Sequence, residues 1–148
     1  MSQSYSGGCL CGKIKYRIDL PADAPDPKIL VCHCISCKAY TGSAFSTNIT
    51  VPEAHLKFTT GEPELFLDPS SDCGMPVRRQ FCRDCGSPLT SKTTGGPADM
   101  IVMKWGTLDN TARRKLQDLS MEIYCRRKDR WLEQLRDAAV PRRDAYEA

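Results

Sequence analysis

The sequence has few histidines and no long apolar run, and both absences narrow what the protein can be. Only two of its 148 residues are histidine, His33 and His55, so an active site built on several imidazoles is excluded. No apolar stretch approaches the roughly 20 residues that a membrane-spanning helix needs. Residues 1–8 lack the basic and apolar regions of a secretory signal, so we expect a cytoplasmic protein without a membrane anchor.

Neither basic nor acidic residues dominate the sequence. The 21 basic and 18 acidic residues leave a net charge of +3. Two basic clusters, at residues 113–115 and 126–128, are interspersed with acidic residues, which is typical of a solvated charged face. We therefore expect a small-molecule partner rather than a nucleic acid.

The apolar pattern predicts many short strands and few helices. Ile14, Tyr16, Ile18 and Leu20 alternate with charged residues, which predicts a half-buried strand over 13–20. Gly61-Glu62-Pro63 predicts a turn that joins 56–60 and 64–67 into a hairpin. Apolar residues at helical spacing predict a helix over 130–140, and we expect further strands at 28–34, 44–51, 77–81, 89–93, 99–105 and 121–125. The predicted fold class is mainly β, and the length fits one domain over 1–148.

Nine cysteines in a chain without an export signal argue against a disulfide scaffold. Seven of them fall into three groups, which are Cys9/Cys11, Cys32/Cys34/Cys37 and Cys82/Cys85. Alternate side chains of an extended segment share one face, so Cys32 and Cys34 should lie together with His33 turned away. Residues 81–86, Phe-Cys-Arg-Asp-Cys-Gly, are typical of a zinc-ribbon knuckle, in which a tight turn brings two sulfurs together.

Counting ligands divides these seven cysteines between two zinc ions. A structural zinc is closed by four protein ligands, whereas a catalytic zinc keeps three and leaves one position open. The two separated pairs make four, and Cys32, Cys34 and Cys37 make an open site. Two alternatives stay open: His33, Cys73 or Cys125 closes the second site, or both sites only support a binding surface.

An open thiolate-bound zinc predicts chemistry on sulfur. It could bind and deprotonate a substrate thiol, which then adds to an aldehyde; the reverse reaction is carbon–sulfur bond cleavage. The alternatives are a zinc-dependent lyase or dehydratase acting on another small molecule, and a non-catalytic zinc-stabilised binding module. Candidate substrate residues are Phe45, as a wall of the site, and Ser71 and Cys73, on the loop before Arg79. A basic residue there could hold a substrate carboxylate.

The chain resembles the glutathione-dependent formaldehyde-activating enzyme family, also called the centromere-protein-V-like family. The resemblance rests on residues 7–16 (GGCLCGKIKY), 32–37 (CHCISC), 42–45 (GSAF) and 81–89 (FCRDCGSPL), supported by 106–109 and Trp131. It covers a core of about 5–132, leaving 133–148 as a helical or loose tail. The basic 110–130 region and the helical tail depart from the family pattern.

The resemblance implies a β-tent fold of small antiparallel sheets built around two zinc sites. It implies a structural zinc on Cys9, Cys11, Cys82 and Cys85, and an active-site zinc on Cys32, Cys34 and Cys37. It also implies carbon–sulfur lyase chemistry, with glutathione as the thiol and formaldehyde as the aldehyde.

Overall fold

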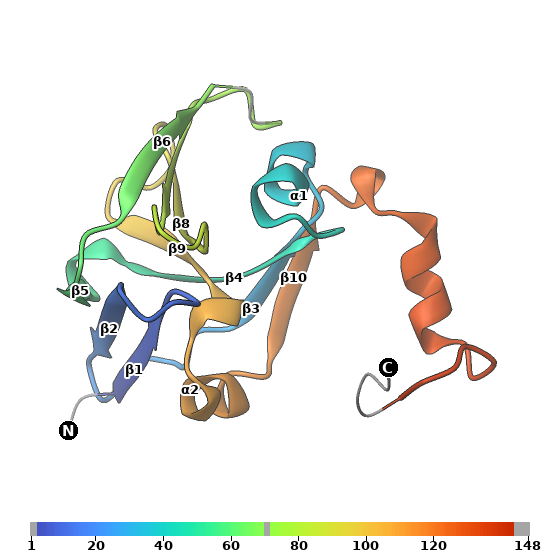
Figure 1. Ribbon diagram of the computed structural model, residues 1–148, viewed down its shortest axis with the longest axis horizontal. Coiled ribbons are helices and arrows are strands. Elements are labelled where there is room, and N and C mark those ends of the chain that lie inside the picture. The colour runs from blue at the N-terminus through green and yellow to red at the C-terminus, as the bar shows by residue number, and fades with distance from the viewer. Residues whose placement is uncertain (1–2, 70–71, 144–148) are drawn as a thin grey trace.

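The computed structural model of the protein describes residues 3–69 and 72–143, and the architecture is mainly β, as predicted (Figure 1). Its strands form two sheets of three and seven strands. The strands are β1 Gln3–Gly8, β2 Lys15–Leu20, β3 Ile29–Cys32, β4 Ser46–Pro52, β5 Leu56–Thr60, β6 Glu64–Asp68, β7 Val77–Phe81, β8 Pro88–Thr93, β9 Met100–Lys104 and β10 Leu119–Ile123. The helices are α1 Ile35–Thr41 and α2 Asn110–Lys115, with 3-10 helices η1 Glu53–His55, η2 Trp105–Thr107, η3 Cys125–Arg127 and η4 Arg130–Arg136.

The smaller sheet has the order β1-β2-β5 and is antiparallel. The predicted alternation holds in β2, because Tyr16, Ile18 and Leu20 are buried while Lys15 and Arg17 are exposed. The buried residues join one continuous core with side chains from the larger sheet, such as Ile49, Val51, Leu89 and Met103. Apolar burial on one face of each sheet is what holds the two together.

The larger sheet has the order β10-β3-β4-β9-β8-β7-β6. Its pairings are antiparallel except one, because the edge strand β10 runs parallel to β3. This one pairing departs from the all-antiparallel expectation. It brings Ile123 beside Cys32, so residues more than 80 positions apart meet at the end of β3.

The predicted hairpin over 56–60 and 64–67 is wrong. Both segments are strands, but β5 pairs with β2 and β6 pairs with β7. Gly61, at φ 67°, redirects the chain from one sheet to the other. The two strands differ in how their side chains are buried. Phe58 of β5 packs edge-on against Tyr16 of β2, whereas Phe66 of β6 remains exposed.

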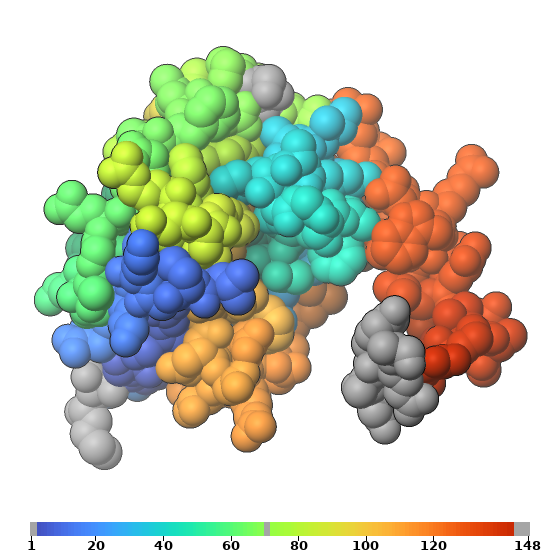
Figure 2. Space-filling model, viewed as in Figure 1, coloured from blue at the N-terminus to red at the C-terminus, as the bar shows by residue number. Residues whose placement is uncertain are grey.

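Two further expectations need correction at the C-terminal side. The helix predicted over 130–140 is a 3-10 helix that ends at Arg136, with Leu132 buried and Trp131 and Leu135 exposed. This segment projects from the side of the molecule (Figure 2). Cys125, within the strand predicted over 121–125, is exposed in a 3-10 turn because β10 already ends at Ile123.

Within the described residues, no helix is long and apolar enough to cross a membrane.

Asp109 caps α2. Its Oδ1 accepts a hydrogen bond of 2.8 Å from the Ala112 amide, and its own amide donates to the Ser6 carbonyl of β1. We expect Asp109→Ala to cost about 1 kcal/mol of the free energy of unfolding and to lower Tm by about 2–4 °C. Asp109→Asn keeps a capping oxygen and should stay near wild type. Thermal unfolding followed by circular dichroism measures both variants, and equal losses would show that the cap contributes nothing.

Candidate metal centres

The first centre joins two tight turns that lie far apart in the sequence. Cys9 and Cys11 lie in the turn after β1, and Cys82 and Cys85 lie in the turn after β7. The amide of Gly86 donates to the Cys82 carbonyl at 2.8 Å, and Gly86 adopts φ 73°, so the predicted knuckle is confirmed. The four sulfur atoms all lie within 4.8 Å of one another.

Polar contacts hold these two turns together. The Leu10 amide donates to the Ser87 hydroxyl at 2.9 Å, and Lys13 pairs with Asp84 at 2.9 Å. Hydrogen bonds from Ser87 lower the pKa of Cys85 to about 5. A thiol that ionises this readily is prepared for metal ligation, because the thiolate is the ligating form.

The second centre lies where β3 meets α1, and we call Cys32, Cys34 and Cys37 the cysteine trio. Cys32 ends β3, Cys34 caps α1, and Cys37 lies in the first turn of α1, where its amide donates to the Cys34 sulfur at 3.3 Å. All three side chains are buried, and their sulfur atoms lie within 4.8 Å of one another. Hydrogen bonds from Cys32 and Cys34 lower the pKa of Cys37, so the trio stabilises a thiolate at Cys37. The sequence did not predict the helix α1, which makes this geometry possible.

Both centres fit a thiolate-bound metal ion. Tetrahedral zinc with Zn–S bonds of about 2.3 Å places its sulfurs about 3.8 Å apart. The Cys9–Cys11 and Cys11–Cys82 sulfur distances are 3.5 Å and 3.8 Å. Soft sulfur ligands favour zinc over hard cations such as magnesium. The seven cysteines thus gather into the predicted groups of four and three, and each group could hold a metal ion.

The three residues considered as a fourth ligand lie outside the trio. Among the described residues, neither His33, Cys73 nor Cys125 belongs to a group of candidate ligand atoms within 4.8 Å of one another. His33 is buried and turned away as expected. Its Nε2 lies 3.0 Å from Glu122 Oε1, and its ring packs against Phe45 with centroids 5.7 Å apart.

A cavity of about 210 Å³ opens beside the cysteine trio. Apolar side chains, among them Leu30, Ile123 and Tyr124, form part of its wall and pack against the trio. Tyr124 adopts φ 55°, and among the described residues it is the only one other than glycine with a positive φ. Such a conformation is uncommon for a side chain of this size, and strained residues gather at functional sites.

The predicted substrate residues divide between several places. Cys73 lines the cavity, with its sulfur 3.5 Å from the Met75 carbonyl. Phe45 does not line this cavity, because it packs on His33, which faces away from the trio. Ser71 lies outside the described residues.

Two cations in the cavity wall are buried, which sequence reasoning did not predict. Arg79 is only 2% exposed, and its Nε donates to Asp68 Oδ2 at 2.8 Å. Lys104 is 4% exposed, and its Nζ donates to Asn48 Oδ1 at 2.8 Å. Burial lowers the pKa of Lys104 to about 8. The one available signal was the position of Lys104 at the end of the apolar run Met100–Lys104, where a charged side chain shares a buried strand.

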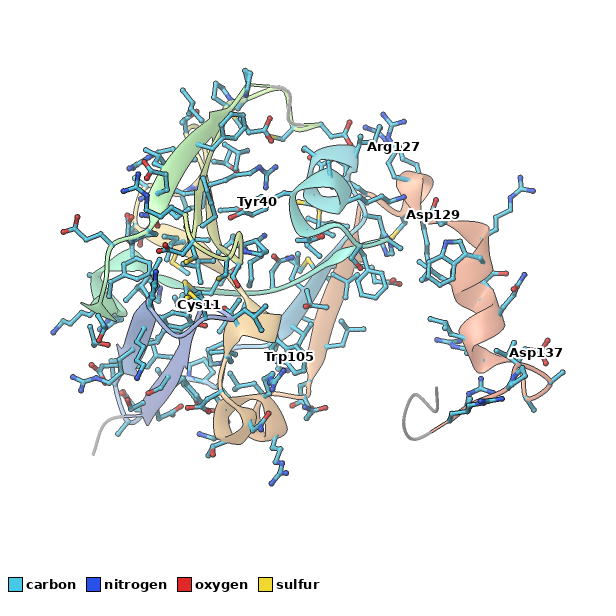
Figure 3. The ribbon with its side chains drawn as sticks, in the orientation of Figure 1. Cys11, Tyr40, Trp105, Arg127, Asp129 and Asp137 are labelled. Carbon is cyan, nitrogen blue, oxygen red and sulfur yellow. The ribbon has the colours of Figure 1, made fainter. Side chains whose placement is uncertain are left out.

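The side chain of Tyr40 extends from α1 toward the larger sheet (Figure 3). Its hydroxyl donates to the Gln80 and Thr90 carbonyls at 2.5 Å and 3.2 Å. The Arg79 guanidinium carbon lies 4.9 Å from the centre of the Tyr40 ring, and the Lys104 Nζ lies 5.4 Å from it. One ring therefore positions both cations against the face of α1 that carries Cys37.

Fold and site together define a mainly β protein with two cysteine clusters that could hold metal ions. The chain belongs to the glutathione-dependent formaldehyde-activating enzyme family, whose model matches residues 4–127. It is similar to an uncharacterized lyase of Schizosaccharomyces pombe, with 29% identity over 101 residues; the match covers 68% of this chain and 66%, just under two thirds, of the relative. It is also similar in fold to a solved protein of Rhodobacter sphaeroides, with a TM-score of 0.56 and 19% identity, covering 78% of this chain and 98% of that one.

Proposed function

We propose that the protein is a zinc-dependent carbon–sulfur lyase that makes and breaks adducts between a thiol and an aldehyde. One observation carries the proposal: three buried cysteine sulfurs within 4.8 Å of one another line a cavity that can admit a small molecule. Membership of the family and the lyase name of the fission-yeast relative support it. The reduced thiols this requires fit a cytoplasmic setting.

In this proposal the four-cysteine centre holds a structural zinc and the cysteine trio holds the active-site zinc. The four-cysteine set is complete, so its role is to connect the turns at residues 9–11 and 82–85. The trio provides three ligands and leaves a position for the substrate. A zinc ion bound by the trio would supply a Lewis acid that could stabilise a substrate thiol as its thiolate near neutral pH.

The residues that line the cavity surround the reacting groups. Leu30 and Ile123 limit water around the reacting sulfur, and Cys32, Cys34 and Cys37, which line the same cavity, would hold the metal ion. In the forward direction the substrate sulfur forms a bond to the aldehyde carbon, and the thiol proton ends on the aldehyde oxygen. In the reverse direction the carbon–sulfur bond breaks, the hydroxyl proton returns to sulfur, and the aldehyde leaves. No oxidant or reductant is needed.

The test follows adduct formation and breakdown by NMR in mixtures of formaldehyde with glutathione, 2-mercaptoethanol or mercaptoacetate. We expect the zinc-loaded protein to accelerate exchange at least about tenfold over the spontaneous rate for one or more of these thiols, in line with the usual contribution of a positioned catalytic group. Cys34→Ser should abolish the acceleration because it removes a trio ligand. Cys125→Ser is the matched control, since Cys125 is exposed and outside both clusters, and it should retain full activity.

Two results would contradict the proposal. Full activity of Cys34→Ser would show that the trio is not the reaction centre. No acceleration with any of the three thiols, in protein that keeps both metal ions, would favour a non-catalytic binding module instead.

A further inference from the structure

Lys104 is a buried ammonium group without a carboxylate partner among the residues that the structure describes. Within the same residues its one hydrogen-bond acceptor is Asn48 Oδ1. An ammonium group has three donors, so two remain for other partners. Burying an ammonium group is unfavourable unless its charge and its donors have partners. The sulfurs of the trio interact with its charge, whereas two unused donors beside a cavity indicate a ligand that accepts hydrogen bonds.

The hydrogen bonds of Asn48 orient its side chain toward Lys104. Its amide nitrogen donates to the Leu30 carbonyl at 3.1 Å, to the Ser46 carbonyl at 3.1 Å and to the Ser46 hydroxyl at 2.9 Å. These bonds turn the amide oxygen of Asn48 toward Lys104. Because Asn48 is itself buried, the ammonium group is fixed by a rigid side chain of β4.

Arg79 differs from Lys104 because its charge is already balanced. Its Nε pairs with the Asp68 carboxylate, and its Nη1 donates to the Ser91 hydroxyl at 3.1 Å. Arg79 and Asp68 together are neutral, so Lys104 is the cation of the cavity wall that has no carboxylate partner among the described residues. Arg79 still contributes guanidinium donors to that wall, since it lines the cavity too.

A zinc ion bound by the cysteine trio would leave this centre negatively charged. Three thiolates and one divalent ion sum to one net negative charge, which repels a second anion that approaches the same centre. A neutral thiol suffers less from this repulsion than one that carries a carboxylate. Lys104 offsets this negative charge, because its ammonium group lines the same cavity as the trio, and its two remaining donors can bind a substrate carboxylate.

We propose that Lys104 is a specificity-determining residue that binds a carboxylate of the substrate, and that the substrate is a small thiol with its carboxylate close to the sulfur. This inference rests on the proposed function, since it places the substrate sulfur at the trio. The size of the cavity supports it: about 210 Å³ lies below the roughly 300–1,000 Å³ of sites for drug-sized ligands. Sulfur and carboxylate must then fit between the trio and Lys104 within one small space.

The test measures binding of three thiols to the zinc-loaded protein by isothermal titration calorimetry. The probes are mercaptoacetate, 2-mercaptoethanol and cysteamine, which place an anion, a neutral group and a cation at a similar distance from sulfur. We expect mercaptoacetate to bind at least about tenfold more tightly than 2-mercaptoethanol, as a hydrogen bond to a charged group provides, and cysteamine to bind most weakly. Lys104→Met should weaken mercaptoacetate binding at least about tenfold and change 2-mercaptoethanol binding less than about threefold.

Measurements of Tm and of metal content distinguish substrate binding by Lys104 from a structural role of this residue. Lys104→Met replaces a buried unpaired charge by an apolar side chain, so it should fold with an unchanged or higher Tm and retain two zinc ions. Lys57→Met, at an exposed position of β5, is the control and should bind all three thiols like wild type.

The following outcomes would contradict the inference. Equal weakening of all three thiols, or loss of one zinc ion from Lys104→Met, would show that Lys104 serves the metal centre rather than the substrate. Equal binding of the three thiols by wild type would refute the anionic substrate class while the proposed function stands. If none of the three thiols binds, the proposed function fails as well.

Discussion

Cys82→Ala should leave the chain unfolded at room temperature and without bound metal. Cys82 is fully buried within the main core, and its sulfur lies 3.8 Å from Cys11 at the centre that connects two distant turns. Binding of a structural zinc contributes about 10–16 kcal/mol in small zinc domains, which is as large as the whole stability of a typical domain, about 5–15 kcal/mol. Far-UV circular dichroism and elemental analysis of the purified variant measure the two effects.

The matched variant is Cys34→Ala, which removes one sulfur from the cysteine trio. The trio forms a separate cluster packed on Leu30, Ile123 and Tyr124 rather than within the main core. We therefore expect Cys34→Ala to fold cooperatively, with a lower Tm and one zinc ion instead of two. If Cys34→Ala unfolds as Cys82→Ala does, the trio is a second structural site and the open-site proposal is wrong.

Local spacing was enough to predict the grouping of the cysteines. The pairs Cys9/Cys11 and Cys82/Cys85 each lie within one turn, so their sulfurs meet whatever the rest of the chain does. Counting four ligands against three then required no tertiary information. The same holds for the alternating strand β2 and for Asp109, whose capping role depends on the next three residues.

The partners of the trio could not be predicted because they come from distant strands. Lys104 ends β9 and reaches the cavity because β9 pairs with β4, and β4 pairs with β3, which carries Cys32. Arg79 lies on β7, which pairs with β8, and β8 in turn pairs with β9. These pairings are set by burial of whole strands, which also explains why the turn at 61–63 misled the hairpin prediction. Charged residues usually lie at the surface, and an isolated sequence does not show that Asp68 will lie beside Arg79 or that Asn48 will lie beside Lys104.

Asp68→Ala is the second substitution with a large expected effect, because it leaves the Arg79 guanidinium buried without its carboxylate. Both side chains of this pair are almost fully buried, and the Nε–Oδ2 distance is 2.8 Å. Removing one partner of a buried ion pair costs about 3–5 kcal/mol, most of which is the unfavourable burial of the charge that remains. Urea unfolding should show this loss as a lower midpoint with an unchanged slope.

The chain offers a control with the same distance and different burial. Arg17 and Asp19 also lie 2.8 Å apart, but their side chains are 51% and 29% exposed. Water screens such a pair, so Asp19→Ala should cost less than about 1 kcal/mol.

A double variant then distinguishes the pair from its separate parts. Asp68→Ala combined with Arg79→Met removes both charges, so we expect it to recover most of the stability that Asp68→Ala alone loses. Additive losses in the double variant would contradict this account, because they would mean that each side chain stabilises the fold independently. The double variant also tests the cavity. With the Arg79–Asp68 pair removed, preferential binding of mercaptoacetate should persist, because the ammonium group of Lys104 remains in the cavity wall.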